Sequence, residues 1–500
     1  MNRREFMGVA GPALAITVVP RHVLGGTGYV APSDKINLAL IGAGTQQLGE
    51  LTRLIRDERI QVVSLSDPNK EPVNYKAWSP DAGLRRQIRE MIGNSNWYEG
   101  TQITAGRDCG LDFVNKYYAA KTGKADYLGC TAYADFREML EKEKSVDTVK
   151  IIVPDHLYPT LAIASLKKGK HVIMHKPTGN RVYELRKTLE AVREHPGLTT
   201  HQLAWSSNER YAIVKKWIDG GAIGNLREVH NWSYRPVWEQ WPEYFTERPP
   251  VPKGLDWELW LGPWPERPYH PNYTHTVFRG WFDFGAGSVA DMGIYSLWPL
   301  FTTFGIDTPP VQVESYSTVM RTTDPNGAQK ALPNTVSFPW SSVFRWKFPK
   351  IQSGQALDLF WYDGGIKPNN PPELEADNKF LDSEGMMFVG DSGKILAGFR
   401  CENPRIIPEQ KMKSFTGTEK APEVTQADGT DTWIEAVRNQ RQSPGNLLSS
   451  GVVNETALLA MVALRAGGRI SYDPATMQVT SPGNAGQYLH RSAYRPGWEL

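Results

Sequence analysis

Residues 35–50, KINLALIGAGTQQLGE, join an apolar run to a glycine turn and then to a helix-like sequence. The apolar run has the composition of a buried strand, and Gly42 and Gly44 follow it directly. Glycines permit a tight turn and let backbone N–H groups approach a pyrophosphate at the N-terminus of a helix. The turn and the following Gln46 and Gln47 are therefore predicted to bind a dinucleotide, although Gln47 occupies the third glycine position of G-x-G-x-x-G.

Strand-like and helix-like patterns alternate along the first two fifths of the chain. Three apolar runs end in polar or turn residues: IQVVSLSD at Asp67, VKIIVPDH at Pro154 and His156, and HVIMHK at His175 and Lys176. Alternation of this kind predicts βαβ units and a doubly wound parallel sheet, the Rossmann fold. Ligands bind at the carboxyl ends of such strands, so these five residues are predicted to line a cofactor crevice.

The acidic residue at the end of the second apolar run bears on the choice of cofactor. Asp67 can hydrogen-bond both ribose hydroxyls and repel a 2′-phosphate. NAD is therefore predicted in preference to NADP.

Lys176 is followed at once by Pro177, which fixes the exit path of the chain. A lysine here is either a surface charge at a strand end or a reactive amine that faces the crevice. Oxidation of a carbinol requires a base within hydrogen-bond reach of the hydroxyl, and burial beside a positive nicotinamide lowers a lysine pKa. Lys176 is predicted to take the hydroxyl proton.

The 500 residues include 56 basic and 54 acidic side chains, which give a net charge of +2. This balance offers no electrostatic case for binding nucleic acid or an anionic membrane. The ten histidines lack the spacing of metal ligands, and three cysteines cannot form a disulfide framework, although Cys109 and Cys130 could pair. We expect a globular protein of two or three domains without a metal site.

The chain begins MNRREFMGVAGPALAITVVP, in which paired arginines precede an uncharged apolar stretch. This pattern is typical of a twin-arginine export signal, with an ordinary secretory signal as the alternative. The apolar stretch is shorter than the roughly 20 residues that span a bilayer, and we expect no other segment of that length. We therefore expect a signal peptide over 1–32, a periplasmic protein and no membrane insertion.

Several longer stretches resemble the Gfo/Idh/MocA oxidoreductase family, in particular its exported bacterial branch. They are APSDKINLALIGAG, VPDHLYPTLAIASLKKGKHVIMHKP, GAIGNLREVHNW, LDWELWLGPWPERPYHPNY, RGWFDFGAGSVADMGIYSLW and the tail AYRPGWEL. With the strand pattern, the resemblance implies an α/β protein whose Rossmann domain spans 33–205, with an insertion at about 71–130. It implies a mixed α/β domain at 206–500 with a large, open, mostly antiparallel sheet. This sheet carries the substrate site and often the interface of a homo-oligomer, here expected to be a dimer or tetramer.

The resemblance also implies a bound nicotinamide cofactor and a sugar or polyol substrate. The family's E-K-P motif is His175-Lys176-Pro177 here, and its D-x-G-x-H motif runs from Asp291 to Tyr295. Lys176, Tyr295 and Asp291 are therefore the predicted catalytic residues. Tyr295 is expected to relay a proton or bind a hydroxyl, with its pKa lowered by the ammonium, unless it only packs in a helix. Asp291 orients either group, and His175 contacts the ribose or supports the lysine.

An aromatic-rich stretch at 232–298 holds eight of the 17 tryptophans. Aromatic rings suit stacking on sugars, although core packing is the common role of any single one. Trp238 is one candidate platform. The predicted substrate-binding residues are His201, Trp232, Arg235, Tyr273, His275 and Arg279.

Three functions are consistent with this sequence. The first is an NAD(P)-dependent oxidoreductase that transfers hydride from a sugar or glycoside hydroxyl to tightly held NAD, with Lys176 assisting proton transfer. The second is a glycosidase that uses NAD for transient C3 oxidation, elimination, hydration and re-reduction. The third is a sugar-binding protein without catalysis, which Gln47, His175 and Tyr295 favour and which Lys176 and Asp291 disfavour.

Overall fold

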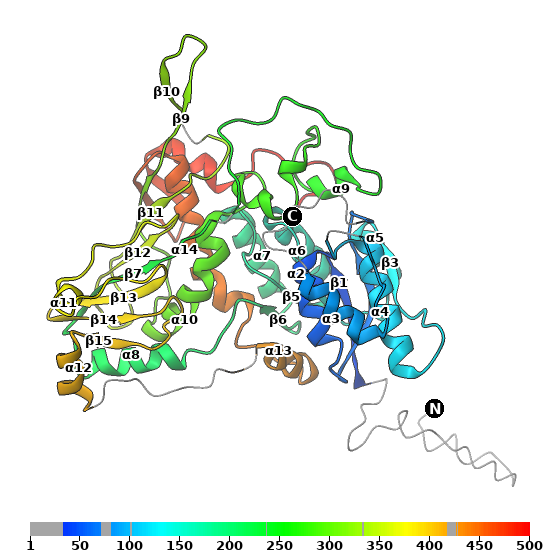
Figure 1. The fold of residues 1–500 in the computed structure, drawn as a ribbon, viewed down its shortest axis with the longest axis horizontal. Coiled ribbons are helices and arrows are strands. Elements are labelled where there is room, and N and C mark those ends of the chain that lie inside the picture. Colours follow the sequence, from blue (N-terminus) through cyan, green and yellow to red (C-terminus); the bar gives the residue numbers. More distant parts are fainter. Residues whose placement is uncertain are drawn as a thin grey trace, which may run out of the picture.

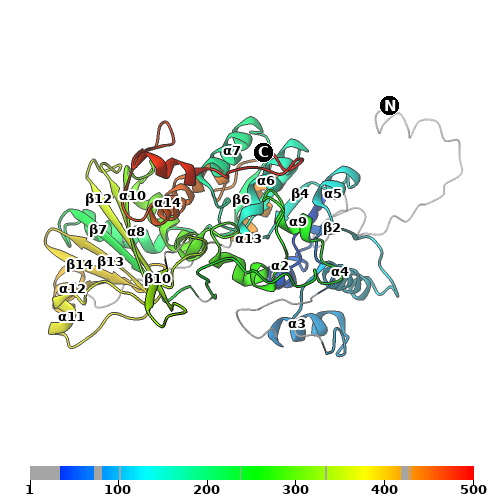
Figure 2. The same cartoon turned by 90° about the horizontal axis from the view of Figure 1, so that it is seen from above.

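The computed structural model describes residues 34–71, 82–100, 103–236, 238–332, 335–417, 427 and 429–500. The expected signal peptide lies outside the described residues. Within these ranges the chain forms two large β-sheets, with a layer of helices between them (Figure 1, Figure 2).

In the described part of the chain, the first sheet has six parallel strands in the order β3-β2-β1-β4-β5-β6. Its strands are β1 (Ile36–Ile41), β2 (Ile60–Ser66), β3 (Thr131–Tyr133), β4 (Thr148–Ile151), β5 (His171–Met174) and β6 (Thr200–Gln202). Its helices are α2 (Thr45–Leu54), α3 (Ala82–Ile92), α4 (Arg107–Thr122), α5 (Phe136–Lys142), α6 (Tyr158–Lys167) and α7 (Val182–Glu194). The order reverses between β1 and β4, and doubly wound sheets bind ligands at the carboxyl ends of strands at such a point. The predicted Rossmann fold is confirmed.

The segment between β2 and β3 is the one for which an insertion at about 71–130 is expected from the sequence. Its described part holds α3 and α4, and α4 packs on β2 and buries Phe113. The three cysteines, Cys109, Cys130 and Cys401, are buried and free, so the possible Cys109–Cys130 disulfide is not formed.

Over the described ranges, the second sheet has nine strands in the order β15-β14-β13-β7-β12-β11-β8-β16-β17. They are β7 (Leu226–Trp232), β8 (Gln312–Ser317), β11 (Ser342–Phe348), β12 (Leu357–Tyr362), β13 (Gly385–Gly390), β14 (Gly393–Ala397), β15 (Arg405–Ile407), β16 (Ile470–Asp473) and β17 (Gln478–Ser481). Among the described strands of this sheet, only β7 and β12 pair in parallel, so the predicted large, mostly antiparallel sheet is confirmed. Strands β9 (Met320–Thr323) and β10 (Gln329–Leu332) form a hairpin that projects beyond the sheet (Figure 1).

Helices α8 (Glu209–Asp219), α10 (Ile294–Phe304) and α14 (Leu447–Arg465) lie between the two sheets (Figure 2). Strand β11 alternates buried and half-buried residues because one face of the second sheet packs on this layer. The other α-helices are α9 (Trp257–Leu261), α11 (Pro372–Ala376), α12 (Glu409–Thr416) and α13 (Gly429–Arg438). The short helices are η3 (Asp155–Leu157), η4 (Pro271–Tyr273), η5 (His275–Gly280), the π-helix η6 (Val289–Gly293) and η7 (Gly483–Leu489).

Helix α14 corrects the expectation that no segment beyond the N-terminus approaches the length of a membrane span. Its 19 residues include an apolar window of mean hydropathy 1.6, which meets that criterion by length and composition. However, 83% of this window is buried inside the protein, and α14 packs against both α7 and β8. It is therefore a core helix that joins the two domains.

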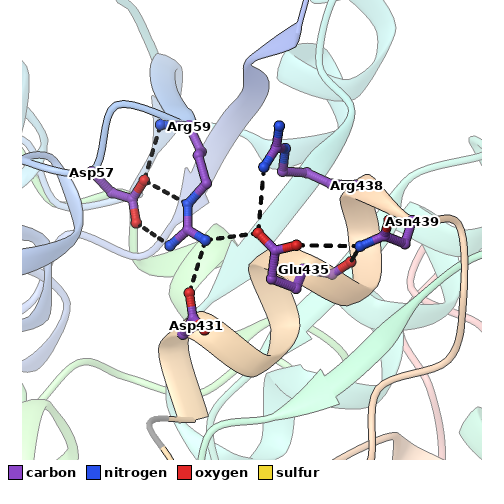
Figure 3. A network of polar contacts seen from close by, with 6 residues as sticks. All are labelled: Asp57, Arg59, Asp431, Glu435, Arg438 and Asn439. Atoms are coloured by element: carbon purple, nitrogen blue, oxygen red, sulfur yellow. Dashed lines mark hydrogen bonds and ion pairs between the residues drawn. The ribbon is translucent and has the colours of Figure 1, made fainter. Parts of the chain in front are cut away.

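Helix α13 returns from the C-terminal part of the chain to the first domain. Trp433 is fully buried in the core on the α2 and α4 side of the Rossmann sheet. At the helix surface, Arg59 Nη1 lies 2.8 Å from Asp431 Oδ1 and 2.7 Å from Glu435 Oε1 (Figure 3). The first domain is thus completed by residues far beyond its expected C-terminal end.

Replacing Trp433 by alanine should destabilise the protein by about 3–5 kcal/mol, because a large ring leaves a cavity in a close-packed core. The matched control is Trp340→Ala, since Trp340 is 53% exposed, and a surface change of this kind is worth about 0.5 kcal/mol or less. Denaturant midpoints of the two variants would measure the difference. Equal midpoints would show that α13 contributes nothing to the core of the first domain.

Candidate active site

A cavity of about 290 Å³ lies at the carboxyl ends of β1, β2, β4 and β5, and the second domain closes it from the other side. The first domain contributes Gly42, Gly44, Thr45, Gln46, Asp67, Pro154, His175 and Lys176, among others. The second domain contributes Arg235, Trp238, Trp260, Tyr269, His275, Arg279, Asp291 and Tyr295, among others. All three predicted catalytic residues and most of the predicted cofactor-binding residues therefore meet at one cavity.

The glycine turn forms a cradle between β1 and α2. Gly42 has a φ of +93°, and a Cβ there would lie 2.1 Å from the carbonyl oxygen of Ile152. A Cβ at Gly44 would meet no atom within 4 Å, so the backbone is open toward the cavity at that residue. The first N–H groups of an α-helix have no partner within the helix, and α2 begins at Thr45. This arrangement fits the pyrophosphate of a dinucleotide.

Asp67 lies beside the same turn, at the end of β2. Its Oδ2 accepts a hydrogen bond from the Ala43 N–H at 2.6 Å, and its Oδ1 accepts one from the Asn69 N–H at 2.7 Å. Burial raises the pKa of Asp67 to about 6, although these hydrogen bonds and Arg107 oppose the rise. The carboxylate therefore borders the cavity where the ribose next to a bound pyrophosphate would lie.

Two predicted cofactor-binding residues lie outside the cavity. Gln47 is buried beneath the turn, where its Nε2 donates to the Lys150 carbonyl at 3.3 Å and its Oε1 accepts from Lys150 Nζ at 2.9 Å. His156 packs against Trp260 and Phe284, and its Nε2 lies 3.1 Å from the Trp260 carbonyl oxygen. Burial lowers the pKa of His156 to about 3, so the ring is neutral at ordinary pH.

Lys176 and Asp291 form a buried ion pair in the wall of the cavity. Lys176 follows β5, and Asp291 lies in the π-helix η6, a distortion that occurs frequently at functional sites. Arg279 approaches the same carboxylate, with Nε 3.3 Å from Asp291 Oδ1. Burial alone would raise the pKa of Asp291, but the charges of Lys176 and Arg279 outweigh it and lower the pKa to about 2. The carboxylate is therefore ionised and fixes the position of the amine.

Burial has the opposite consequence for the amine itself. It is the largest influence on Lys176 and lowers its pKa, and Arg279 adds to this effect while Asp291 opposes it. A buried amine with a lowered pKa can release and accept a proton more readily than an exposed lysine.

Tyr295, on α10, completes this side of the cavity. Its Oη lies 3.3 Å from His175 Nε2, and Lys176 Nζ lies 5.4 Å from the centre of its ring. The expectation that the ammonium lowers the pKa of Tyr295 is wrong, because burial and the charges of Asp291 and Glu50 raise it. Tyr295 is therefore a neutral hydrogen-bonding group at ordinary pH.

The position of His175 is set by two residues that no motif marks. Glu50, on α2, has Oε1 3.5 Å from His175 Nε2 and Oε2 2.7 Å from Lys150 Nζ. Burial would raise the pKa of Glu50, but Lys150 and His175 lower it well below its usual value. The feature of the sequence that could have indicated this buried ion pair is Lys150, a lysine inside an otherwise apolar strand.

The predicted substrate-binding residues divide into two groups. Arg235, His275 and Arg279 line the cavity, whereas His201, Trp232 and Tyr273 do not. His201 Nδ1 lies 2.7 Å from Ser443 Oγ, Trp232 Nε1 donates to the Asp382 carbonyl at 3.0 Å, and Tyr273 Oη accepts from the Phe245 N–H at 3.2 Å. Sequence reasoning missed Trp260 and Tyr269, which lie in the aromatic-rich stretch that it singled out.

The chain matches two family models. One is described as an oxidoreductase family's NAD-binding Rossmann fold and matches residues 112–201, and the other is described as an oxidoreductase family's C-terminal alpha/beta domain and matches residues 212–332.

Two curated relatives are similar to parts of the chain. A dTDP-3,4-didehydro-2,6-dideoxy-alpha-D-glucose 3-reductase from Streptomyces violaceoruber is 30% identical over 105 residues, which are 21% of this chain and 30% of the relative. A glycosyl hydrolase family 109 protein from Solibacter usitatus is 35% identical over 143 residues, which are 27% of this chain and 32% of the relative. The chain thus spans less than a third of each of these relatives.

Among solved structures, the WlbA dehydrogenase from Bordetella pertussis, in complex with NADH and UDP-GlcNAcA, is similar with a TM-score of 0.50. The alignment covers 88% of this chain and 99% of that one, at 16% sequence identity. At this level of identity the similarity establishes a shared fold.

Proposed function

Because the chain belongs to the Gfo/Idh/MocA oxidoreductase family and carries its NAD-binding Rossmann domain, we propose that it oxidises a hydroxyl of a sugar or glycoside. The observation that carries this proposal is the placement of the buried Lys176 amine in the same cavity as the glycine turn. Gly42, Gly44 and Gln46 would hold the dinucleotide, with Asp67 at its ribose. When bound there, NAD would supply a hydride acceptor for the carbinol carbon.

The protein's own part in the reaction is to hold the sugar and move its hydroxyl proton. Lys176 in its neutral form accepts that proton, and Asp291 with Arg279 keeps the amine in place. Tyr295, neutral and directed at His175, donates or accepts a hydrogen bond at the sugar. The rings of Trp238, Trp260 and Tyr269 shield the cavity from water and offer surfaces for a sugar ring.

Export by the twin-arginine pathway would place the protein in the periplasm, where no pool of free NAD exchanges with it. We therefore propose that the dinucleotide is tightly held and leaves the cytoplasm with the folded protein. The bound dinucleotide is then regenerated on the protein, because the oxidation of one sugar is followed by the reduction of another.

We also propose a homo-oligomer. Tyr316, Arg345 and Phe360 lie on the face of the second sheet that turns away from the helix layer, and Tyr316 is 62% exposed. Association through this face would cover these side chains.

A glycosidase is the second candidate, supported by the similarity to a glycosyl hydrolase family 109 protein. After transient oxidation, such a reaction needs a base for a carbon-bound proton and an acid for the leaving group. Tyr295 and His275 both line the cavity and are the candidates for these roles.

The test begins with denaturation of the purified protein and identification of the released dinucleotide by mass. The native protein is then incubated with a panel of sugars and nitrophenyl glycosides. We expect NAD or NADH to be released, and NADH absorbance to change in proportion to added sugar. Free reducing sugar without net NADH would favour the glycosidase. If protein supplied with NAD carries out neither reaction, the sugar-binding alternative replaces both.

A further inference from the structure

The loop that follows β5 holds a second functional side chain besides Lys176. Four residues after the lysine lies Asn180, which is fully buried. Its Nδ2 donates to three backbone carbonyls of the second domain, at 3.3 Å to Phe282, 2.8 Å to Asp283 and 3.3 Å to Gly285. An amide has two N–H donors, so these contacts use its full donor capacity. One buried amide therefore holds residues 282–286 against the loop that carries Lys176.

Other side chains of the first domain hold the same segment. Arg181 Nη1 donates to the Phe282 carbonyl at 3.0 Å. Asp155 Oδ2 accepts a hydrogen bond from the Ala286 N–H at 3.0 Å. Asp155 follows β4 and Arg181 precedes α7, and both are buried. The 282–286 segment is thus fixed to the loops after two neighbouring strands of the Rossmann sheet.

This segment leads directly into the π-helix that carries Asp291. Gly287 turns the chain with a φ of +78°, and a Cβ there would lie 2.6 Å from the ring of Phe338. Ser288 Oγ then donates to the Asp363 carboxylate where η6 begins. A turn that is packed this closely leaves little freedom between its two ends. The position of the 282–286 segment therefore determines where Asp291 stands.

The same segment also packs on Arg279, the other residue that contacts the Asp291 carboxylate. A Cβ at Gly285 would lie 2.5 Å from Arg279 Cα and 2.6 Å from the Arg279 carbonyl oxygen. The two backbones are therefore in direct contact, and a shift of the segment would move Arg279 as well.

Resting on the proposed function, we infer that Asn180 is a positioning residue for proton transfer, because it fixes the 282–286 segment so that Asp291 meets the Lys176 amine. Lys176 and Asn180 belong to one loop, so the base and the side chain that places its carboxylate are held together. A misplacement of about 1 Å in a catalytic group costs up to about 10²-fold in rate. Loss of the Asn180 amide should have an effect of this size.

The charged and titratable groups around Lys176 come from several elements. They are His175 on its own loop, Asp155 on η3, Arg279 on η5, Asp291 on η6 and Tyr295 on α10, with Arg235 near Asp291 and Arg400 over the Tyr295 ring. Burial lowers the pKa of Lys176, Asp291 is the strongest influence that raises it, and Arg279 lowers it less strongly. If Asp291 and Arg279 withdraw together, the pKa of Lys176 therefore falls further.

The first measurement is the pH profile of kcat/KM for sugar oxidation by Asn180→Leu, which keeps a similar volume and removes both donors. We expect the plateau to fall about 10²-fold and the ascending limb to move to lower pH. Trp433→Ala is the control, because it destabilises a separate core of the first domain, and it should leave the limb in place. A protein that is merely less stable has no reason to shift the limb.

The second measurement is a crystal structure of Asn180→Leu, which needs no activity. The distance from Lys176 Nζ to Asp291 Oδ1 should exceed about 4 Å, the limit of an ion pair. If Asn180→Leu does not fold, Asn180→Ala is measured in the same two ways. An intact ion pair in the variant, or a limb that stays at the pH of the unchanged protein, would overturn the inference. If the unchanged protein oxidises no sugar, the proposed function fails, whereas the distance in the crystal still decides the role of Asn180.

Discussion

Replacing Lys176 by methionine is expected to lower kcat/KM for sugar oxidation by about 10²- to 10⁴-fold, the range that a positioned acid–base group contributes. Methionine keeps an unbranched apolar stem in the buried position and removes only the amine that accepts the hydroxyl proton. The measurement is the initial rate of NADH formation. Lys168→Met is the matched control, because the Lys168 side chain is 49% exposed on the same domain, and it should leave the rate unchanged.

The pH dependence separates this role from a structural one. Burial lowers the pKa of Lys176 below the ordinary value of 10.5. Oxidation uses the neutral amine, so kcat/KM should rise with pH and level off once the pH exceeds that lowered pKa. The Lys176→Met variant should show no such rise. A variant that keeps either the rate or the ascending limb would mean that another group takes the proton.

The sequence predicts the part of the site that local patterns encode. Each apolar run in the sequence stops at a polar residue, which marks the end of a strand. Because parallel strands end at a common edge of the sheet, Asp67, His175 and Lys176 could be placed together from their positions alone. The placement of Asp291 and Tyr295 in the same cavity was predicted from family resemblance. No local pattern brings η6 and α10 to the end of β5.

The remaining errors come from contacts between distant segments. Trp232 and Tyr273 lie in a stretch rich in aromatic residues, but their polar atoms are used by Asp382 and Phe245, 150 and 28 positions away. Whether an aromatic ring faces a cavity or a core depends on which segment packs on it, and a single sequence does not encode that directly.

Helix α13 gives the same lesson for the domain boundary. Its apolar face is visible as a pattern, but nothing local shows that it packs on the Rossmann core rather than on the sheet that precedes it in the chain.

Gln47 shows how a departure from a motif is accommodated. Its amide pairs with Lys150 instead of crowding the turn.

A methyl group at Gly42 is expected to abolish dinucleotide binding. Gly42 holds a φ of +93°, where residues other than glycine are strained, and the new Cβ would lie 2.1 Å from the Ile152 carbonyl oxygen. That oxygen belongs to the backbone just after β4 and cannot rotate away, so the turn itself has to move. Gly42→Ala should therefore lower the melting temperature of the protein without cofactor and leave no dinucleotide bound after purification.

Two neighbouring glycines make this result specific. A Cβ at Gly44 or at Gly49 would meet no atom within 4 Å. Gly49→Ala, within α2, should be neutral or stabilise the protein by about 0.5–1 kcal/mol, as glycine replacement within a helix does. Gly44→Ala should preserve the melting temperature of the cofactor-free protein but weaken dinucleotide binding, because its methyl group points into the space where the pyrophosphate would lie. If Gly44→Ala binds the dinucleotide as the unchanged protein does, the phosphates do not rest on this turn, and the cofactor approaches Lys176 from another direction.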